Sequence, residues 1–519
     1  MKKRFIGTAV TVAVGAVLYA CGGTDAPSID VTQGTVLQNA TVVNTRDGSL
    51  TAGVAVVVDG GIIKQVVSAG VTVNVRGTAQ SVDATGKFIV PGYLDMHTHA
   101  IDSADLQPTN WPLFIANGIT GIREMRGSSD LIARAKKLNA DSAAGVVDAP
   151  EVLMMPGEII GQIPAPPTAL IATNAAAATA EVQKQKAYGA NFIKMFNVNR
   201  EASLAILAEA KNQGISAAGH LSPALSATES SNAGWKAIEH LGSGVGVLLD
   251  CAGDEAAVRT LLLGSATAPG TGGNPNGLLP PTWSATPVTA PLYQRVLDSY
   301  SDTKCNSMAQ TFATNNTWNV PTLIRLRTQH FVDSAAYRTD PNLIYVSKAT
   351  KASWEASAVA RAGFPPTALA TFQQYYALQQ TLPKLMKKNG AKLLAGSDTA
   401  LQAPWVIPGF SLHQEFALLA ASGLSPLEIL QMTTLNGAEF LNRQSTMGTV
   451  ESGKNADLVV LDANPVTDVA NMSKIAGVML KGKYFAKAAL DKQKADVAAA
   501  YASQVLATTA TAAEAPHID

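Results

Sequence analysis

Short apolar runs recur along the middle of the chain, and each of them ends in or encloses a residue that can bind a metal ion. These runs are 91–99, 191–196, 214–220, 235–240 and 393–398. Runs of this length between turn signals predict β-strands. Stretches with helical patterns, such as 200–212 and 372–389, separate them. Because strands alternate with helices, the pattern predicts an α/β fold with a parallel sheet.

The metal-binding residue types occupy equivalent places on these strands. His97 and His99 are two residues apart, so a strand turns both imidazoles to the same face. Two imidazoles that converge from one rigid strand form half of a divalent-metal site. The other strands supply further candidate ligands, namely Lys194, His220, His240 and Asp398. Ligands at the carboxyl ends of several parallel strands are typical of a TIM-barrel active site.

In their order and residue types these positions resemble the amidohydrolase superfamily. The pattern of that superfamily is His-x-His on strand one, lysine on strand four, histidines on strands five and six, and aspartate on strand eight. Six residues match it one for one: His97, His99, Lys194, His220, His240 and Asp398. The phrases 118–123, 320–323 and 447–462 are similar to the prolidase-like and imidazolonepropionase-like branch. The resemblance covers about 37–485.

The resemblance implies a (β/α)8 TIM barrel with a small β-sandwich domain built from both flanks of the chain. The flanks, 30–90 and 444–486, contain short β-branched runs broken by Gly, Asp and Asn turns. The catalytic barrel would then occupy 91–443. This length exceeds the roughly 250 residues of a typical TIM barrel, so we expect an insertion at about 251–316.

Two further segments lie outside the regular pattern. The segment 264–291 is rich in Gly, Pro, Thr and Ser, and it is either a lid over the site or a surface excursion. The end of the chain, 487–519, predicts one alanine-rich helix followed by a loose tail.

The same resemblance implies a centre with two divalent metal ions. His97 and His99 would bind the more buried ion together with Asp398, and His220 and His240 would bind the more exposed ion. Nitrogen and oxygen ligands of this kind favour zinc, and manganese or cobalt could substitute for it.

A bridging ligand and a catalytic base complete the expected mechanism. Lys194 lies in an apolar strand, where burial favours the neutral amine. A neutral amine can take up carbon dioxide, and the resulting carbamate has two oxygens with which to bridge two ions. A hydroxide shared by two ions would attack the substrate carbonyl. Asp398 would act as general base and then as general acid, since it would take the proton and pass it to the leaving amine.

We therefore expect a metal-dependent hydrolase that cleaves the amide bond of a dipeptide-like or N-acyl amino acid substrate. The alternative within the superfamily is a mononuclear deaminase or a hydrolase of a cyclic imide, a lactam or an ester. Deaminases of the superfamily commonly place a glutamate shortly after the strand-five histidine, whereas no acid occurs in 221–224. A non-catalytic lipoprotein that binds a ligand is a further alternative, because a fold alone does not define a function.

Polar residues beyond the strand ends are candidates for contact with the substrate. Arg325, Arg327 and His330 follow strand seven, where an arginine could bind a substrate carboxylate through two hydrogen bonds. A solvated position is the competing interpretation for both arginines. Arg123 and Glu124 end strand two, where they either support the site or pair with each other.

The amino terminus has the features of an export signal. Residues 1–4 are basic at three positions, 5–20 are apolar, and Cys21 follows. This arrangement predicts a secretory signal rather than a membrane span, and 18–21 resembles the cleavage box of bacterial lipoproteins. We therefore expect a lipoprotein signal at 1–21, a lipidated Cys21, and an exported, periplasmic protein anchored to the outer membrane. An ordinary signal peptide with a bystander cysteine is the alternative.

Composition limits the partners of the protein. The formal net charge is zero, 15% of residues are charged, and no basic patch is interleaved with aromatic residues, so we expect no nucleic acid partner. We expect a small-molecule amide as substrate and membrane contact only through the lipid anchor, and the sequence allows a homo-oligomer without specifying one. In an exported protein, Cys251 and Cys305 are either a disulfide or two free thiols.

Overall fold

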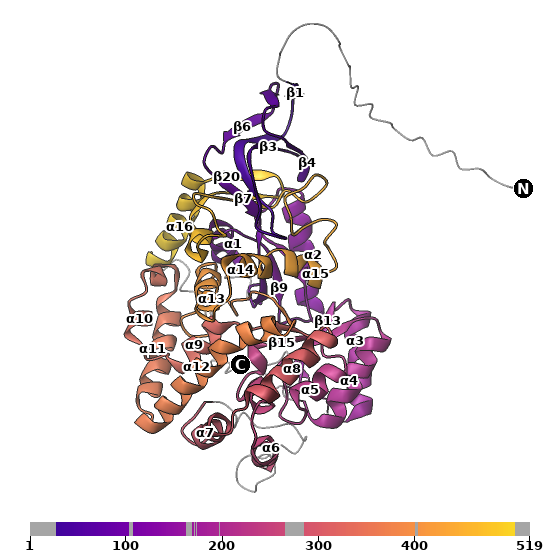
Figure 1. Ribbon diagram of the computed structural model, residues 1–519, viewed down its shortest axis with the longest axis vertical. Coiled ribbons are helices and arrows are strands. Elements are labelled where there is room, and N and C mark those ends of the chain that lie inside the picture. Colours follow the sequence, from indigo (N-terminus) through magenta and orange to yellow (C-terminus); the bar gives the residue numbers. More distant parts are fainter. Residues whose placement is uncertain are drawn as a thin grey trace, which may run out of the picture.

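The chain forms a strand-rich layer at one end and a barrel surrounded by helices at the other (Figure 1). This computed structural model describes residues 27–503 except 103–106, 162–168, 171, 173, 197, 265–284 and 400–402. The predicted lipoprotein signal with Cys21, most of the segment 264–291, and the tail 504–519 lie outside the described residues. Within the described part, no helix combines the length and the apolar character needed to span a bilayer.

Parallel strands in the middle of the chain form the barrel predicted from the sequence. One ladder joins β8, β9 and β10, and a second runs from β13 to β17 in chain order. Asn191 N donates to Met155 O at 2.9 Å on one side, and Met96 N donates to Ala395 O at 3.0 Å on the other, so the two ladders close on each other. The barrel strands are β8 (Tyr93–Thr98), β9 (Ile119–Glu124), β10 (Glu151–Met154), β13 (Phe192–Met195), β14 (Ser216–Gly219), β15 (Ala237–Glu239), β16 (Trp318–Val320) and β17 (Lys392–Leu393).

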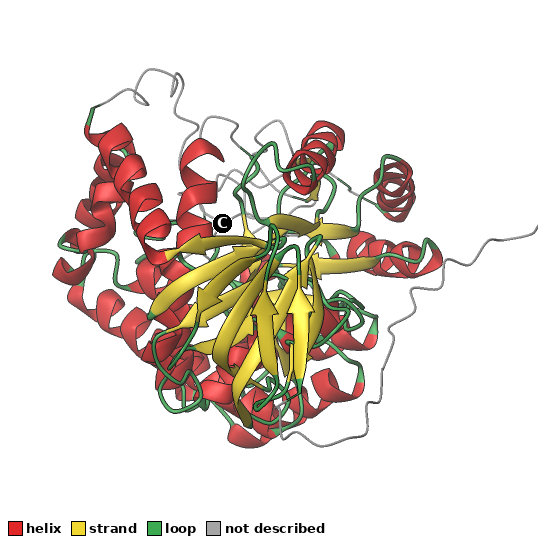
Figure 2. Ribbon diagram, turned by 90° about the horizontal axis from the view of Figure 1, so that it is seen from above, coloured by secondary structure: helices red, strands yellow, loops and turns green. Residues whose placement is uncertain are grey.

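Helices lie around the strands in the view from above, in which the strand-rich layer is in front (Figure 2). The predicted helix at 200–212 is α4, whose first turn is capped because the Asn199 side chain accepts a hydrogen bond from Ala202 N. The helix predicted at 372–389 begins earlier, at Pro366, because proline is tolerated in the first turn of a helix. The helices are α1 (Gln107–Ala116), α2 (Ser129–Ala143), α3 (Ala175–Ala187), α4 (Arg200–Asn212), α5 (Ala227–Asn232), α6 (Glu255–Gly264), α7 (Ala290–Asp298), α8 (Asp302–Thr314), α9 (Leu323–His330), α10 (Ala335–Arg338), α11 (Lys348–Ala362), α12 (Pro366–Lys388), α13 (Phe410–Ala421), α14 (Pro426–Met432), α15 (Leu435–Phe440) and α16 (Lys487–Ala502).

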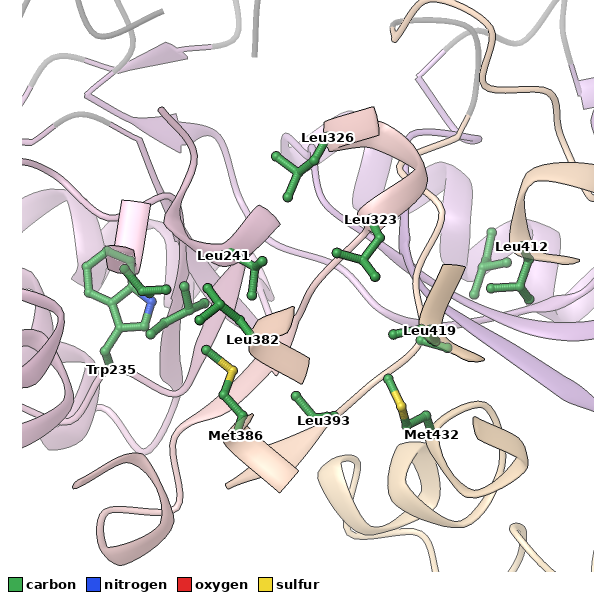
Figure 3. Packing of buried hydrophobic residues seen from close by; sticks show 14 of the residues in the cluster. Trp235, Leu241, Leu323, Leu326, Leu382, Met386, Leu393, Leu412, Leu419 and Met432 are labelled. Atoms are coloured by element: carbon green, nitrogen blue, oxygen red, sulfur yellow. The ribbon is translucent and has the colours of Figure 1, made fainter. Parts of the chain in front are cut away.

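Apolar side chains fill the space between the barrel and its helices (Figure 3). Leu382 and Met386 are four residues apart on α12, so they lie on one face of that helix and are buried together with Leu393 of β17. A second cluster, which includes Met96 and Trp318, fills the barrel itself. The barrel is therefore a packed core, and only its carboxyl-terminal rim is available for chemistry.

The region between β15 and β16 contains α6, α7 and α8. A disulfide joins Cys251 to Cys305 of α8, and both residues are completely buried. Of the two alternatives left open by the sequence, the structure contains the disulfide. It fixes the start of this region against the helix that leads back into the barrel.

A mixed sheet from both ends of the chain forms the strand-rich layer. Its strand order is β20-β19-β18-β7-β2-β3-β4, with β6 also paired to β2. Pro91 of β7 pairs with Leu458 of β18, and this pairing joins the two ends of the chain. The sheet contains β2 (Thr35–Val43), β3 (Leu50–Asp59), β4 (Ile62–Val67), β6 (Gln80–Asp83), β7 (Phe88–Pro91), β18 (Leu458–Leu461), β19 (Ile475–Leu480) and β20 (Lys483–Ala486).

Both faces of this sheet are covered near β3. Val56 and Val58 belong to one buried cluster, whereas Ala55 and Val57 belong to another. The second cluster also contains Val31 and Val73, from the small pair formed by β1 (Ser28–Val31) and β5 (Thr72–Val75). Burial on both faces explains why residues 54–58 of β3 are continuously apolar instead of alternating.

The disulfide gives a test of stability. Because the bond closes a segment with a sequence separation of 54, the double variant Cys251→Ser and Cys305→Ser should lose about 2–4 kcal/mol of unfolding free energy. Urea unfolding under oxidising conditions measures the loss. Wild type treated with a reductant should approach the stability of the double variant, and equal stability of oxidised wild type and variant would contradict the assignment.

Candidate metal centre

The structure brings the six predicted ligands to the carboxyl-terminal rim of the barrel. All six are buried, with at most 4% of each residue exposed. They come from five different strands or from the residues that follow them: His97 and His99 from β8, Lys194 from β13, His220 from β14, His240 from β15 and Asp398 from beyond β17.

Asp398 lies at the centre of this group. Its Oδ1 is 3.1 Å from His97 Nε2 and 3.3 Å from His99 Nε2, and its Oδ2 is 3.9 Å from His240 Nε2. One ligand atom each from His97, His240 and Asp398 lie within 4.8 Å of one another. Two imidazole nitrogens and a carboxylate oxygen at such spacing suit a divalent ion that accepts nitrogen and oxygen ligands.

His220 and Lys194 extend the centre on the side of His240. The rings of His220 and His240 are 4.9 Å apart between centroids and nearly perpendicular. Lys194 on β13 is next to Ala218 on β14 in the sheet register, one strand from the segment that carries His220. Its charge acts on both His220 and His240, so the lysine reaches the same buried space.

The imidazoles of His220 and His240 are in the state that binds metal. Neither ring nitrogen of His220, nor His240 Nε2, has a hydrogen-bond partner among the described residues. Burial, followed by the charge of Lys194, lowers the pKa of His220, and burial also lowers the pKa of His240. Neutral imidazoles with unpartnered nitrogens fit a divalent metal ion, because a bound ion would satisfy groups that are otherwise costly to bury.

The backbone is strained at several strand ends around this centre. His240, Thr322 and Asp398 have φ angles of 52°, 42° and 62°, in the left-handed region that non-glycine residues rarely adopt. Each such conformation costs about 1–3 kcal/mol and persists only where the surroundings impose it. The Asp398 N–H donates to His97 O at 2.9 Å, and His240 Nδ1 is 2.5 Å from Thr322 Oγ1. These contacts hold the strained backbone of the three residues in place.

Glu239 is a site residue that the sequence reasoning missed. Its Oε2 is 2.8 Å from His97 Nδ1, and its Oε1 accepts a hydrogen bond from Arg123 Nη2 at 2.6 Å. Burial alone would raise the pKa of Glu239, but Arg123 and His97 lower it to about 2. A carboxylate within the apolar run 235–240 was the available signal, because a glutamate is almost never fully buried unless it is paired.

Arg123 and Glu124 do not pair with each other. Arg123 pairs with Glu239, whereas Glu124 Oε1 accepts hydrogen bonds from Thr98 Oγ1 at 2.7 Å and from Ala100 N at 2.8 Å. Burial raises the pKa of Glu124 to about 7. Both residues therefore support the strand that carries the two histidines.

The three candidate substrate contacts occupy different environments. Arg325 is buried, and its Nε is 2.9 Å from Asp398 Oδ2, so the interpretation of a solvated Arg325 is wrong. Arg327 instead donates to the hydroxyl of Tyr337 at 2.6 Å. His330 is packed against Phe372, with 6.0 Å between ring centroids, and burial lowers its pKa to about 3. Only Arg325 among the three has a contact with the centre that the structure resolves.

Part of the chain is similar in sequence to known proteins. The model of the amidohydrolase family matches residues 377–484. A 5'-deoxyadenosine deaminase of Methanobrevibacter smithii is 40% identical over 63 residues, which are 12% of this chain and 14% of that enzyme. The sequence match therefore spans about one seventh of the relative's length.

Similarity in structure extends over most of the chain. A bottromycin amidohydrolase matches with a TM-score of 0.68 at 17% identity, over 90% of each chain. A Xaa-Pro dipeptidase with bound methionine in its active site matches with a TM-score of 0.59 at 17% identity, over 88% of this chain and 100% of the other. At such low identity these likenesses show the fold. Together with the family model, they confirm the resemblance inferred from the six ligand positions.

Proposed function

We propose that this member of the amidohydrolase superfamily is a metal-dependent hydrolase that cleaves an amide bond by a binuclear mechanism. The convergence of four imidazoles, Lys194 and Asp398 in one buried space at the barrel rim carries this proposal. Structural ion pairs do not account for it, since His220 and His240 keep nitrogens without partners among the described residues. A buried site of this composition is suited to metal-assisted hydrolysis.

The chain provides two sets of ligands for two ions. His97, His99 and Asp398 would hold one ion, and His220 and His240 would hold the other. Lys194, as a carbamate, would join the two sets from the neighbouring strand. When bound, two such ions lower the pKa of a water molecule and polarise the substrate carbonyl.

Asp398 moves the proton in the proposed reaction. Burial alone would raise the pKa of Asp398, but His240 and His97 lower it well below its usual range, so the group is a carboxylate. It would take the proton of the attacking water and pass it to the nitrogen of the leaving amine. The left-handed backbone of Asp398 and its N–H bond to His97 O hold the carboxylate in place for both transfers.

The proposed substrate is a dipeptide-like or N-acyl amino acid amide. Arg325 supports this choice, because a buried guanidinium beside Asp398 is placed to bind a carboxylate near the reacting bond. The structural likeness to a Xaa-Pro dipeptidase agrees with it. A mononuclear deaminase is the second candidate, favoured by the short match to a 5'-deoxyadenosine deaminase. The absence of an acid among the four residues after His220 argues against it.

The number of metal ions tests the binuclear centre. Purified wild type should contain about two divalent ions per chain, whereas Lys194→Ala should lose most of them because the ligand between the two sets is gone. Elemental analysis measures the content, and short carboxylic acids added with metal should restore part of the activity. Lys236→Ala, at the opposite end of the barrel, is the matched control. One ion per wild-type chain would favour the deaminase. Full metal content in Lys194→Ala would show that Lys194 is not the bridging ligand.

The Asp398→Asn variant tests the catalytic role. It should keep substantial metal but lose about 10³–10⁴-fold in kcat, since the proton acceptor and donor are gone. The assay is a panel of N-acyl amino acids, dipeptides, lactams and esters, with Asp148→Asn, a surface variant, as control. Unchanged turnover in Asp398→Asn would mean that another group is the base. Equal near-zero turnover of wild type and Asp398→Asn over the whole panel would favour a non-catalytic binding protein.

The Arg325→Ala variant tests the substrate class. It should lower kcat/KM for an N-acyl amino acid by about 10–100-fold, because a hydrogen bond to a charged group contributes about 1.5–3 kcal/mol. The same substrate with its carboxylate replaced by a carboxamide should show little change between wild type and variant. Arg327→Ala, which loses contacts with Tyr337 and Phe331 and none with Asp398 that the structure resolves, is the control. An equal loss for both substrates would contradict carboxylate recognition.

A further inference from the structure

His97 of β8 and His99, which follows it, are each approached by a carboxylate on the side away from Asp398. Glu239 Oε2 is 2.8 Å from His97 Nδ1, and Asp102 Oδ2 is 3.8 Å from His99 Nδ1. On the opposite edge of each ring, Nε2 faces the same oxygen of Asp398, at 3.1 and 3.3 Å. In both rings, therefore, Nδ1 faces an acid and Nε2 faces Asp398, where the proposed ion would lie.

Each of these carboxylates is in turn paired with an arginine at or just beyond the end of β9. Arg123 Nη2 donates to Glu239 Oε1 at 2.6 Å, and Arg126 Nη1 is 3.3 Å from Asp102 Oδ2. The arginines are three residues apart, so one segment of chain serves both histidines. The result is two parallel series, each running from arginine to carboxylate to imidazole.

The two series differ in tightness and burial. Arg123 and Glu239 are completely excluded from solvent, whereas the Arg126 and Asp102 side chains are 10% and 14% exposed. Arg123 also donates to Met96 O at 3.1 Å, and its guanidinium lies over the rings of Phe192 and Phe440 at 5.0 and 5.1 Å. Arg123 and Glu239 are thus held by several contacts. Because both are buried, water cannot replace a hydrogen-bond partner that either of them loses.

We propose that Arg123 and Glu239 are positioning residues that hold His97 with its proton on Nδ1 and its Nε2 lone pair toward the metal. The inference rests on the proposed metal centre, which it deepens. A neutral imidazole carries one ring proton, and a carboxylate hydrogen-bonded to one nitrogen keeps the proton there. Arg123 holds the carboxylate in place and offsets its charge, so that the acid orients the ring without adding net charge beside the ion. Asp102 lies 3.8 Å from His99 Nδ1, beyond hydrogen-bond distance, so the proposal is confined to His97.

The Glu239→Gln variant tests this role through metal affinity. A glutamine amide can donate to Nδ1 and so favour the wrong tautomer, in which Nε2 carries the proton and cannot bind metal. We expect one of the two zinc equivalents to bind about 10–100-fold more weakly, while the other keeps its affinity. Titration of metal-free protein with zinc against a chromophoric chelator measures both. The visible spectrum of the cobalt-loaded protein should also change, because the ligand field of the affected ion changes.

Glu151→Gln is a matched control, because it removes a carboxylate that pairs with Arg443 at the same distance of 2.6 Å, and no ion pair of Glu151 with a histidine occurs among the described residues. Its zinc affinity and cobalt spectrum should be those of wild type. If Glu239→Gln binds zinc as wild type does, or if both variants weaken binding alike, the positioning role is overturned. A wild type that binds no zinc overturns the proposed function and this inference with it.

Loss of Glu239 leaves the Arg123 cation buried without its carboxylate, and this cost can prevent folding. The double variant Arg123→Met and Glu239→Leu removes both charges and the oxygen that accepts from His97 Nδ1, and it nearly keeps the volume of the pair. It should fold and still show the weaker zinc equivalent. Wild-type affinity in the double variant would overturn the proposal as clearly as in the single one.

Discussion

Closure of the barrel between β8 and the segment after β17 is the interaction on which the site depends. Met96 N donates to Ala395 O, and Asp398 N donates to His97 O, so the first and last strands meet edge to edge. Gly396 allows this approach, because a Cβ there would lie 2.9 Å from His97 Cβ. The Asp95 carboxylate adds a bond from the Ser397 hydroxyl at 2.5 Å. Without these contacts the carboxylate of Asp398 and the β8 imidazoles would belong to separate parts of the fold.

Buried charged groups follow one another across the barrel rim, with the imidazole of His97 between two carboxylates. Arg123, Glu239, His97, Asp398 and Arg325 are successive neighbours, at 2.6, 2.8, 3.1 and 2.9 Å. Each charged member lies between or beside groups that compensate it, which is the condition under which charges can be buried. The series also makes the members interdependent, since removal of one leaves its neighbours buried and unpaired. The reactive carboxylate therefore belongs to a network and is not an isolated acid.

Local patterns were sufficient to predict the fold class and the convergence of the ligand strands, whereas contacts between distant strands were not predictable. Strand alternation predicted that His97 and His99 share a face. The other ligand positions were found because apolar runs end in a polar residue or enclose one. Glu239 was missed because its role depends on Arg123 from another strand, and no local signal links the two. The solvated alternative for Arg325 was wrong because α9 begins only three residues after β16, which turns the arginine back over the rim. The pairing of the cysteines likewise depended on how the helices between β15 and β16 pack.

The position of β7 in the strand-rich layer has a consequence for synthesis. β7 lies between β2 and β18, and β18 leaves the ribosome only after the whole barrel has been made. Until then, β7 has one edge whose N–H and C=O groups lack a partner strand, and such edges readily pair with other chains. A nascent chain that pauses within the barrel would keep this edge open, so prompt completion of translation protects the protein from aggregation.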